Sequence, residues 1–147
     1  MIVQNSMEIK GPLQQVYALA KDVYSYPEFM PDIKSIKVIE RSENGNRIVS
    51  EWAGLVKEFG AIIEWTAEDI WDDQANTCKS SILKSNYYTY MGQWTFTDLG
   101  DGTRVDSEIE IDCDIPRIGT HVKKFIAKKM QANLDHMLTS IKARVEV

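Results

Sequence analysis

The chain has 147 residues, of which 44% are hydrophobic and 27% are charged, and its formal net charge is −5. This length and composition are typical of a single globular domain, 1–147, and argue against any long disordered stretch. The acidic balance excludes a general affinity for nucleic acid, and no apolar run approaches the roughly 20 residues that span a bilayer. With only Cys78 and Cys113 as cysteines, we expect a cytoplasmic protein with no disulfide, metal or cofactor.

The N-terminal part of the chain predicts one strand and two short helices. An extended segment, Ile2–Ile9, ends at Gly11-Pro12, and proline favours a helix start. Apolar residues then recur at helical spacing from Leu13 to Ala20. The following segment, Asp22–Pro31, holds two prolines and three aromatic residues, which predicts a second short helix or turn.

From Ile33 onward the apolar period becomes two, which predicts six further strands in a meander. The first of them ends at the hairpin signal Glu43–Asn46. The others are Arg47–Leu55, Ala61–Trp71, Thr77–Lys84, Tyr87–Thr97 and Thr103–Cys113. The last strand alternates most clearly, with Val105, Ser107 and Ile109 on one face and acidic residues on the other, as in a half-buried antiparallel strand.

After Pro116 the period becomes helical again. One apolar stripe runs from Ile118 to Ile141, which makes a helix of about 25 residues and roughly 35 to 40 Å. Such a helix must bury its stripe, and the sheet is the only large partner. We therefore predict an α+β fold in which a seven-stranded curved antiparallel sheet wraps around the C-terminal helix and leaves an apolar pocket.

Strand phase predicts which side chains line this pocket. If Trp94 faces the core, Tyr88 and Tyr90 face it too. A two-residue turn at Ser85-Asn86 would pair Leu83 with Tyr88 and Ser81 with Tyr90, which turns Cys78 outward. The expected ligand-binding residues are Trp52, Ile63, Trp65, Ser81, Leu83, Trp94, Ile109, Met130, Asn133 and Met137. Apolar walls with a few polar groups favour a small-molecule site; the alternative is a ligand-free core with every hydroxyl hydrogen-bonded.

Three stretches of the chain resemble the START-related, birch-pollen-allergen-like superfamily and its polyketide cyclase/dehydrase members. They are DVYSYPEFMPDIKSIKVIER (Asp22–Arg41), AIIEWTAEDIWD (Ala61–Asp72) and YMGQWTFTDLGDGTRVDSEIEID (Tyr90–Asp112). The resemblance implies the helix-grip fold and a cavity for a polyketide-, quinone- or lipid-like molecule. It also implies possible cyclase or dehydratase chemistry, for which Tyr88, Tyr90 and Ser107 are the candidate proton donors.

Two details refine this resemblance. The YPEFMP stretch is also similar to coenzyme Q-binding and ribosome-associated relatives, in which it forms a flap at the pocket mouth; that similarity makes Phe29 and Met30 the expected gate. Aromatase/cyclase members are associated with a cavity arginine on a central strand, and here Asp69 occupies about that place. No arginine occurs from Ile48 to Gly102, and Arg104 is expected to point outward.

Three functions therefore remain open from the sequence. The first is a binder of a small hydrophobic molecule, acting as a monomer or weak homodimer. The second is an aromatase/cyclase or dehydratase. The third is a ribosome- or protein-interaction module that uses a basic patch of Lys123, Lys124, Lys128 and Lys129.

Overall fold

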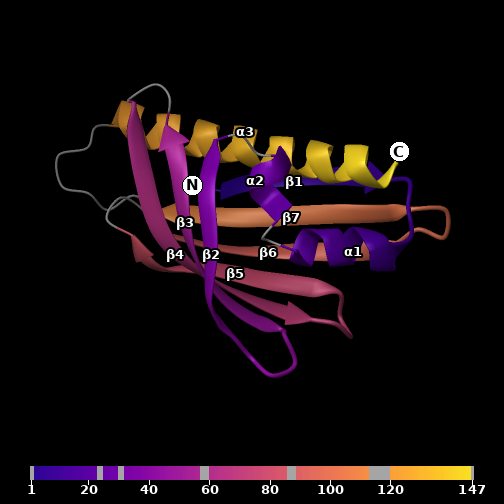
Figure 1. Cartoon of the computed structure of the whole chain (residues 1–147). Helices are drawn as coiled ribbons and strands as arrows, with labels where there is room; N and C mark the ends of the chain where they lie inside the picture. The colour runs from indigo at the N-terminus through magenta and orange to yellow at the C-terminus, as the bar shows by residue number, and fades with distance from the viewer. Residues whose placement is uncertain are drawn as a thin grey trace.

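A seven-stranded antiparallel sheet curves around one long helix, as the sequence predicts (Figure 1). The computed structural model describes residues 2–22, 25–29, 32–56, 60–85, 89–112 and 120–146. In chain order the elements are β1 (Ile2–Ile9), α1 (Leu13–Lys21), α2 (Tyr26–Phe29), β2 (Ile33–Arg41), β3 (Arg47–Val56), β4 (Ala61–Asp72), β5 (Thr77–Ser85), β6 (Thr89–Asp98), β7 (Thr103–Asp112) and α3 (Thr120–Val145). Nowhere in these ranges does a helix combine the length and the hydropathy that a bilayer crossing requires.

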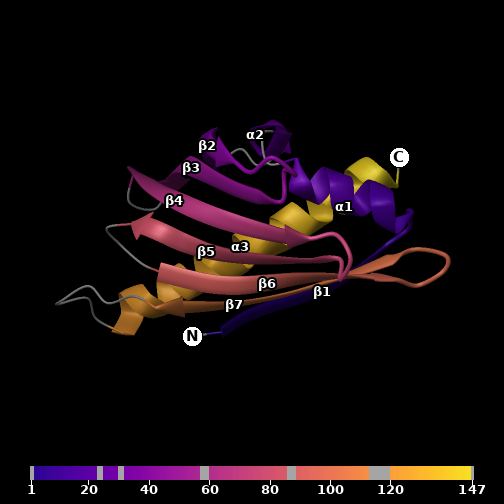
Figure 2. The ribbon, with the colours of Figure 1, turned by 90° about the horizontal axis from the view of Figure 1, so that it is seen from below.

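The strands lie in the order β1-β7-β6-β5-β4-β3-β2. The strands β2 to β7 are therefore a meander, and β1 joins the sheet beside β7 at the far edge. The two short helices α1 and α2 connect the opposite edges, and α1 lies beside the sheet near the C-terminal end of α3 (Figure 2). This connection places α1 and α2 on the same side of the sheet as α3.

The long helix α3 crosses the concave side of the sheet and is attached to its β1 edge. Leu134, Leu138 and Ile141 recur at helical spacing and are 3%, 0% and 1% exposed, so they form the stripe that faces the sheet. The Gln131 side chain donates a hydrogen bond to the carbonyl oxygen of Gln4 at 3.0 Å, and Lys142 donates to that of Glu8 at 3.1 Å. These bonds hold α3 along β1 rather than over the middle strands.

Aromatic packing closes one end of the space between the sheet and the helices. Tyr17 of α1 makes edge contacts with Trp71 and Phe96, each with ring centroids 5.2 Å apart. The Tyr17 hydroxyl donates a hydrogen bond to Asp73 at 2.6 Å. Because these residues come from α1, β4, β6 and the turn after β4, this end of the interior is filled by side chains.

One predicted pairing is wrong, and the error exchanges the inward and outward faces of one strand, β5. Ser81 pairs with Met91 and not with Tyr90, so the register of β5 on β6 differs by one residue from the predicted one. A one-residue slip turns every side chain to the other face. Cys78 is consequently buried rather than outward, and Leu83, which falls at a register shift between β4 and β5, is 54% exposed.

Candidate ligand-binding cavity

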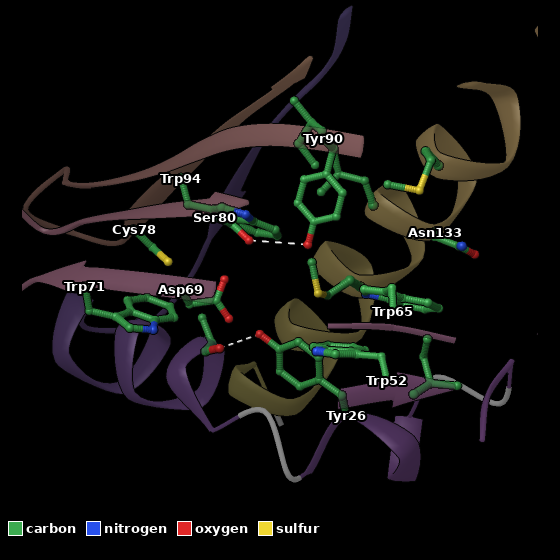
Figure 3. A pocket seen from close by; sticks show the side chains of 16 residues that line it. Tyr26, Trp52, Trp65, Asp69, Trp71, Cys78, Ser80, Tyr90, Trp94 and Asn133 are labelled. Atoms are coloured by element: carbon green, nitrogen blue, oxygen red, sulfur yellow. Dashed lines mark hydrogen bonds between the residues drawn. The ribbon is translucent and has the colours of Figure 1, made fainter. Parts of the chain in front are cut away.

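A cavity of about 150 Å³ lies between the concave face of the sheet and α3 (Figure 3). Strands β4, β5 and β6 form its floor, and α2, β2 and β3 form one wall. The opposite wall comes from Met130, Asn133, Leu134 and Met137, on successive turns of α3. The cavity exists because α3 is held at the β1 edge while the sheet curves away beneath it.

Aromatic side chains make most of the cavity wall. All four tryptophans of the chain line it, together with Tyr26 and Tyr90. Trp52 and Trp65 pair across β3 and β4 and stack with centroids 5.7 Å apart and planes 16° apart. Tyr26 packs edge-on against Trp52 at 5.8 Å. These rings are fixed by one another and present a rigid apolar surface.

A glycine makes this stacking possible. Gly54 lies on β3, and a Cβ atom there would be 3.1 Å from two carbons of the Trp65 ring. That separation is shorter than an ordinary carbon–carbon contact. The absent side chain therefore lets the Trp65 indole lie over the β3 backbone and beside Trp52.

Asp69 is the only carboxylate among the described residues of the cavity wall. It follows Trp65 and Ala67 on the inward side of β4 and is 8% exposed. Burial raises the pKa of its carboxyl group to about 6, the neighbouring charge of Glu68 acts in the same direction, and a hydrogen bond from Ser80 opposes both. Asp69 is therefore mostly ionised at pH 7 and becomes neutral in mild acid.

Asp69, Ser80 and Tyr90 form a polar line across three neighbouring strands. Ser80 of β5 is hydrogen-bonded to Asp69 of β4, and its Oγ lies 3.4 Å from the hydroxyl of Tyr90 on β6. Figure 3 shows the three side chains directed into the same space. This line places a carboxylate and two hydroxyl groups against an otherwise apolar cavity.

Two other titratable groups of the wall are held neutral. The Cys78 thiol is buried, and burial together with the charge of Asp69 raises its pKa well above the usual range. Burial likewise raises the pKa of Tyr26, whose hydroxyl donates to the carbonyl oxygen of Ala20. A thiol in this state is a poor nucleophile, so Cys78 acts as a small apolar residue.

The structure brings many of the predicted site residues together. Those that line the cavity are Trp52, Trp65, Tyr90, Trp94, Ile109, Met130, Asn133 and Met137. Ile63 is half-buried on β4 and lies outside the lining. Ser107 is buried but also lies outside the lining, and its hydroxyl has no hydrogen-bond partner among the described residues.

The other predicted site residues lie elsewhere. Ser81 and Leu83 occupy the opposite face of β5 because of the register slip. Tyr88 and Met30 lie outside the described residues, and Phe29 ends α2 without a described side chain. Asp69 lines the cavity from the inward side of β4, and Arg104 points outward, with its Nε 2.9 Å from Asp106.

The sequence reasoning missed several wall residues, namely Ala20, Tyr26, Ile33, Trp71, Cys78, Ser80 and Leu134. Trp71 shares the odd-numbered face of β4 with Trp65 and Asp69, so strand period alone could have found it. Cys78 and Ser80 needed the correct β5 register. Tyr26 begins the YPEFMP stretch that the resemblance places at the pocket mouth, but no periodicity shows which side chain of so short a helix points inward.

These features define the helix-grip, START-like class. A START superfamily protein from Mycobacterium smegmatis has the same fold, with a TM-score of 0.79 and 18% identity over 99% of this chain and 97% of that one. Residues 1–146 match the model of the family described as polyketide cyclase / dehydrase and lipid transport, so the chain belongs to this family.

Two solved structures and one sequence relative extend this result. A protein of Thermus thermophilus has 29% identity and a TM-score of 0.87, covering 99% of this chain and 97% of that chain. The Zhui aromatase/cyclase from Streptomyces sp. R1128 has 15% identity and a TM-score of 0.87, and the match covers 99% of this chain and 93% of that chain. A Streptomyces halstedii protein provisionally named as a polyketide cyclase is 22% identical over 100 residues, which are 67% of this chain and 90% of that protein.

Proposed function

We propose that the protein binds one small, mainly hydrophobic organic molecule in this cavity, of the polyketide-, quinone- or lipid-like class. The observation that supports this most strongly is an empty volume of about 150 Å³ surrounded by six aromatic side chains where a filled core would otherwise lie. Protein interiors are close-packed, and an apolar cavity of about this size accepts a benzene-sized guest. The enclosed part of the ligand is therefore about one ring or a short chain.

The energetics are sufficient for useful affinity. Removing about 200 Å² of apolar ligand surface from water contributes roughly 5 kcal/mol before ordering costs. The rings of Trp52, Trp65 and Tyr26 are already packed against one another, so little side-chain entropy is lost on binding. We expect dissociation constants of about 0.2 mM to a few millimolar for single-ring ligands.

Tryptophan fluorescence tests this function directly, because every tryptophan lines the cavity. Titration with toluene, 1-naphthol and a naphthoquinone is expected to give saturable changes. Asn133→Phe, which places a ring in the cavity from α3, should weaken binding at least tenfold. Ala132→Phe, at the exposed neighbouring position, is the matched control and should leave binding unchanged. Linear, non-saturating signals with every compound would contradict the proposal.

A second candidate function is acid–base catalysis on a poly-β-ketone, and Asp69 with Tyr90 favours it. A carboxylate with a pKa of about 6 is suited to remove a proton near neutral pH, here from a carbon between two carbonyls. The Tyr90 hydroxyl, 3.4 Å from Ser80 Oγ, would donate a hydrogen bond to the developing enolate oxygen. Intramolecular attack of the enolate carbon on a second carbonyl would then close a ring, and loss of water would follow.

Under this second function, Tyr90→Phe should lower kcat for cyclisation by at least a hundredfold while changing substrate binding less than threefold. The measurement is product formation from a short poly-β-ketone thioester, followed by chromatography, with binding measured separately by fluorescence. Thr89→Val, at an exposed position of the same strand, is the control. If product forms at the unmodified rate in Tyr90→Phe, the acid–base role assigned to this residue is wrong.

A further inference from the structure

We propose that the bound molecule carries one positive charge, as an amine or quaternary ammonium group, and that this charge is seated against Asp69 within the aromatic wall. The inference rests on the proposed binding function and narrows its ligand to a hydrophobic organic cation.

The first argument is the charge balance of the cavity. Asp69 is 8% exposed, and no lysine or arginine is among the described residues that line the cavity with it. Arg47 of β3, which pairs with Ile70 next to Asp69, already has a carboxylate partner, because its Nε is 2.7 Å from Glu68 on the opposite face of β4. A buried carboxylate without a cationic partner is costly, and a ligand cation is what would complete the pair.

The second argument is the count of negative charges. Burial keeps the thiol of Cys78 and the hydroxyl of Tyr26 protonated through the neutral range, since it raises the pKa of each. The side chains that α3 contributes to the wall carry no titratable group. The described cavity therefore holds one negative charge at neutral pH, which matches one positive charge on a ligand.

The third argument is the nature of the surrounding wall. The six aromatic side chains are Trp52, Trp65, Trp71, Trp94, Tyr26 and Tyr90. The face of an aromatic ring attracts a cation, most strongly for tryptophan, and the attraction grows when the cation is desolvated. A neutral ligand without a hydrogen-bond donor gains nothing from Asp69 and has to cover it, whereas an organic cation uses both the rings and the carboxylate.

A matched pair of probes tests this inference. Phenyltrimethylammonium and tert-butylbenzene have the same shape and differ only in a charged nitrogen or a neutral carbon. At pH 8 the unmodified protein should bind the cation at least tenfold more tightly, measured by tryptophan fluorescence and by calorimetry. Asp69→Asn keeps the side-chain shape and should reduce this preference to threefold or less. Asp72→Asn, an exposed carboxylate on the same strand, should leave the preference unchanged.

The pH dependence of probe binding gives an independent readout, because phenyltrimethylammonium keeps its charge at every pH. Its affinity for the unmodified protein should fall as the pH is lowered below about 6, where Asp69 becomes neutral. The described groups that face Asp69 are Ser80, Cys78, Tyr90 and Tyr26, and Glu68 is its neighbour on β4. Burial raises the pKa values of the Cys78 thiol and the Tyr26 hydroxyl, so both stay protonated over this range. Asp69→Asn should therefore abolish the pH dependence.

The outcomes separate the two proposals. Tighter or equal binding of tert-butylbenzene overturns the cationic ligand but leaves a hydrophobic binding site in place. Saturable binding of toluene and 1-naphthol without detectable binding of phenyltrimethylammonium would also overturn the cationic ligand and leave the hydrophobic binding site in place. If no probe of either kind binds saturably, the binding function itself fails. An equal loss of preference in Asp72→Asn would show a general surface-charge effect and would overturn the seating at Asp69.

Discussion

Asp69→Asn is expected to raise the free energy of unfolding at pH 8 by about 3 kcal/mol, which is an uncommon gain for a single polar substitution. The carboxyl group has a pKa of about 6 in the folded protein against 3.8 when it is free of the fold. A shift of about two units corresponds to about 3 kcal/mol of preference for the neutral form. The isosteric amide carries no charge and can still accept the Ser80 hydrogen bond.

The sign of the pH dependence follows from proton uptake. Between pH 3.8 and about 6 the folded protein holds more protons at Asp69 than the unfolded chain does. The stability contributed by this group is therefore present below the unfolded pKa and is lost as the pH rises through the folded pKa. The advantage of Asp69→Asn should be small at pH 4 and reach its full size above pH 7.

Urea unfolding of both proteins at pH 4, 6 and 8 measures this difference. The pKa values of Asp73, Asp106 and Glu146 are lowered by their hydrogen bonds, and their stabilising effect at higher pH is common to both proteins. It cancels when the variants are compared. Asp72→Asn serves as the exposed control. A difference between Asp69→Asn and the unmodified protein that does not change with pH would mean that the folded environment leaves the Asp69 carboxyl group unperturbed.

Leu138→Ala is expected to lower the free energy of unfolding by about 3 kcal/mol. Leu138 is 0% exposed and belongs to the core cluster that joins α3 to α1 and to the sheet. Truncation removes buried apolar surface and leaves a hole that the close-packed neighbours fill only in part. The substitution tests whether α3 is held by packing rather than by its polar bonds to β1.

Chemical unfolding of Leu138→Ala against Thr139→Ala provides the measurement. Thr139 is the next residue of the same helix and is exposed, so its substitution should change stability by less than about 0.5 kcal/mol. A loss below about 1 kcal/mol for Leu138→Ala would contradict the packing of α3 against the core.

The fold could be predicted because its two strongest patterns are long. The alternation from Thr103 to Asp112 and the apolar stripe of α3 each persist over several periods, and each appears in the structure. Strand phase also predicted that Trp65 of β4 lines the cavity, and it does. A pattern of this length leaves little choice of phase.

The remainder of the site needed tertiary information. The strand TCKSSILKS has polar residues at both odd and even positions, so alternation alone does not show which side chains point inward. The prediction relied on an assumed turn length instead. A one-residue error in that turn moved Cys78 and Ser80 out of the predicted cavity. Tyr26 reaches the cavity from a four-residue helix, where no period exists. The raised pKa of Asp69 arises only once the folded chain buries its carboxyl group.

The position of β1 has a consequence for how the protein forms during synthesis. Ile2 pairs with Glu110, and Ile9 with Thr103. Strand β1 therefore cannot form its hydrogen bonds in the sheet until β7 has been synthesised. Pairings between such distant parts of a chain close slowly, typically in milliseconds to seconds for sheet-rich domains. Until then the nascent polypeptide exposes an unpaired β-edge, and we expect this interval to be when newly made molecules are most exposed to aggregation and to capture by chaperones.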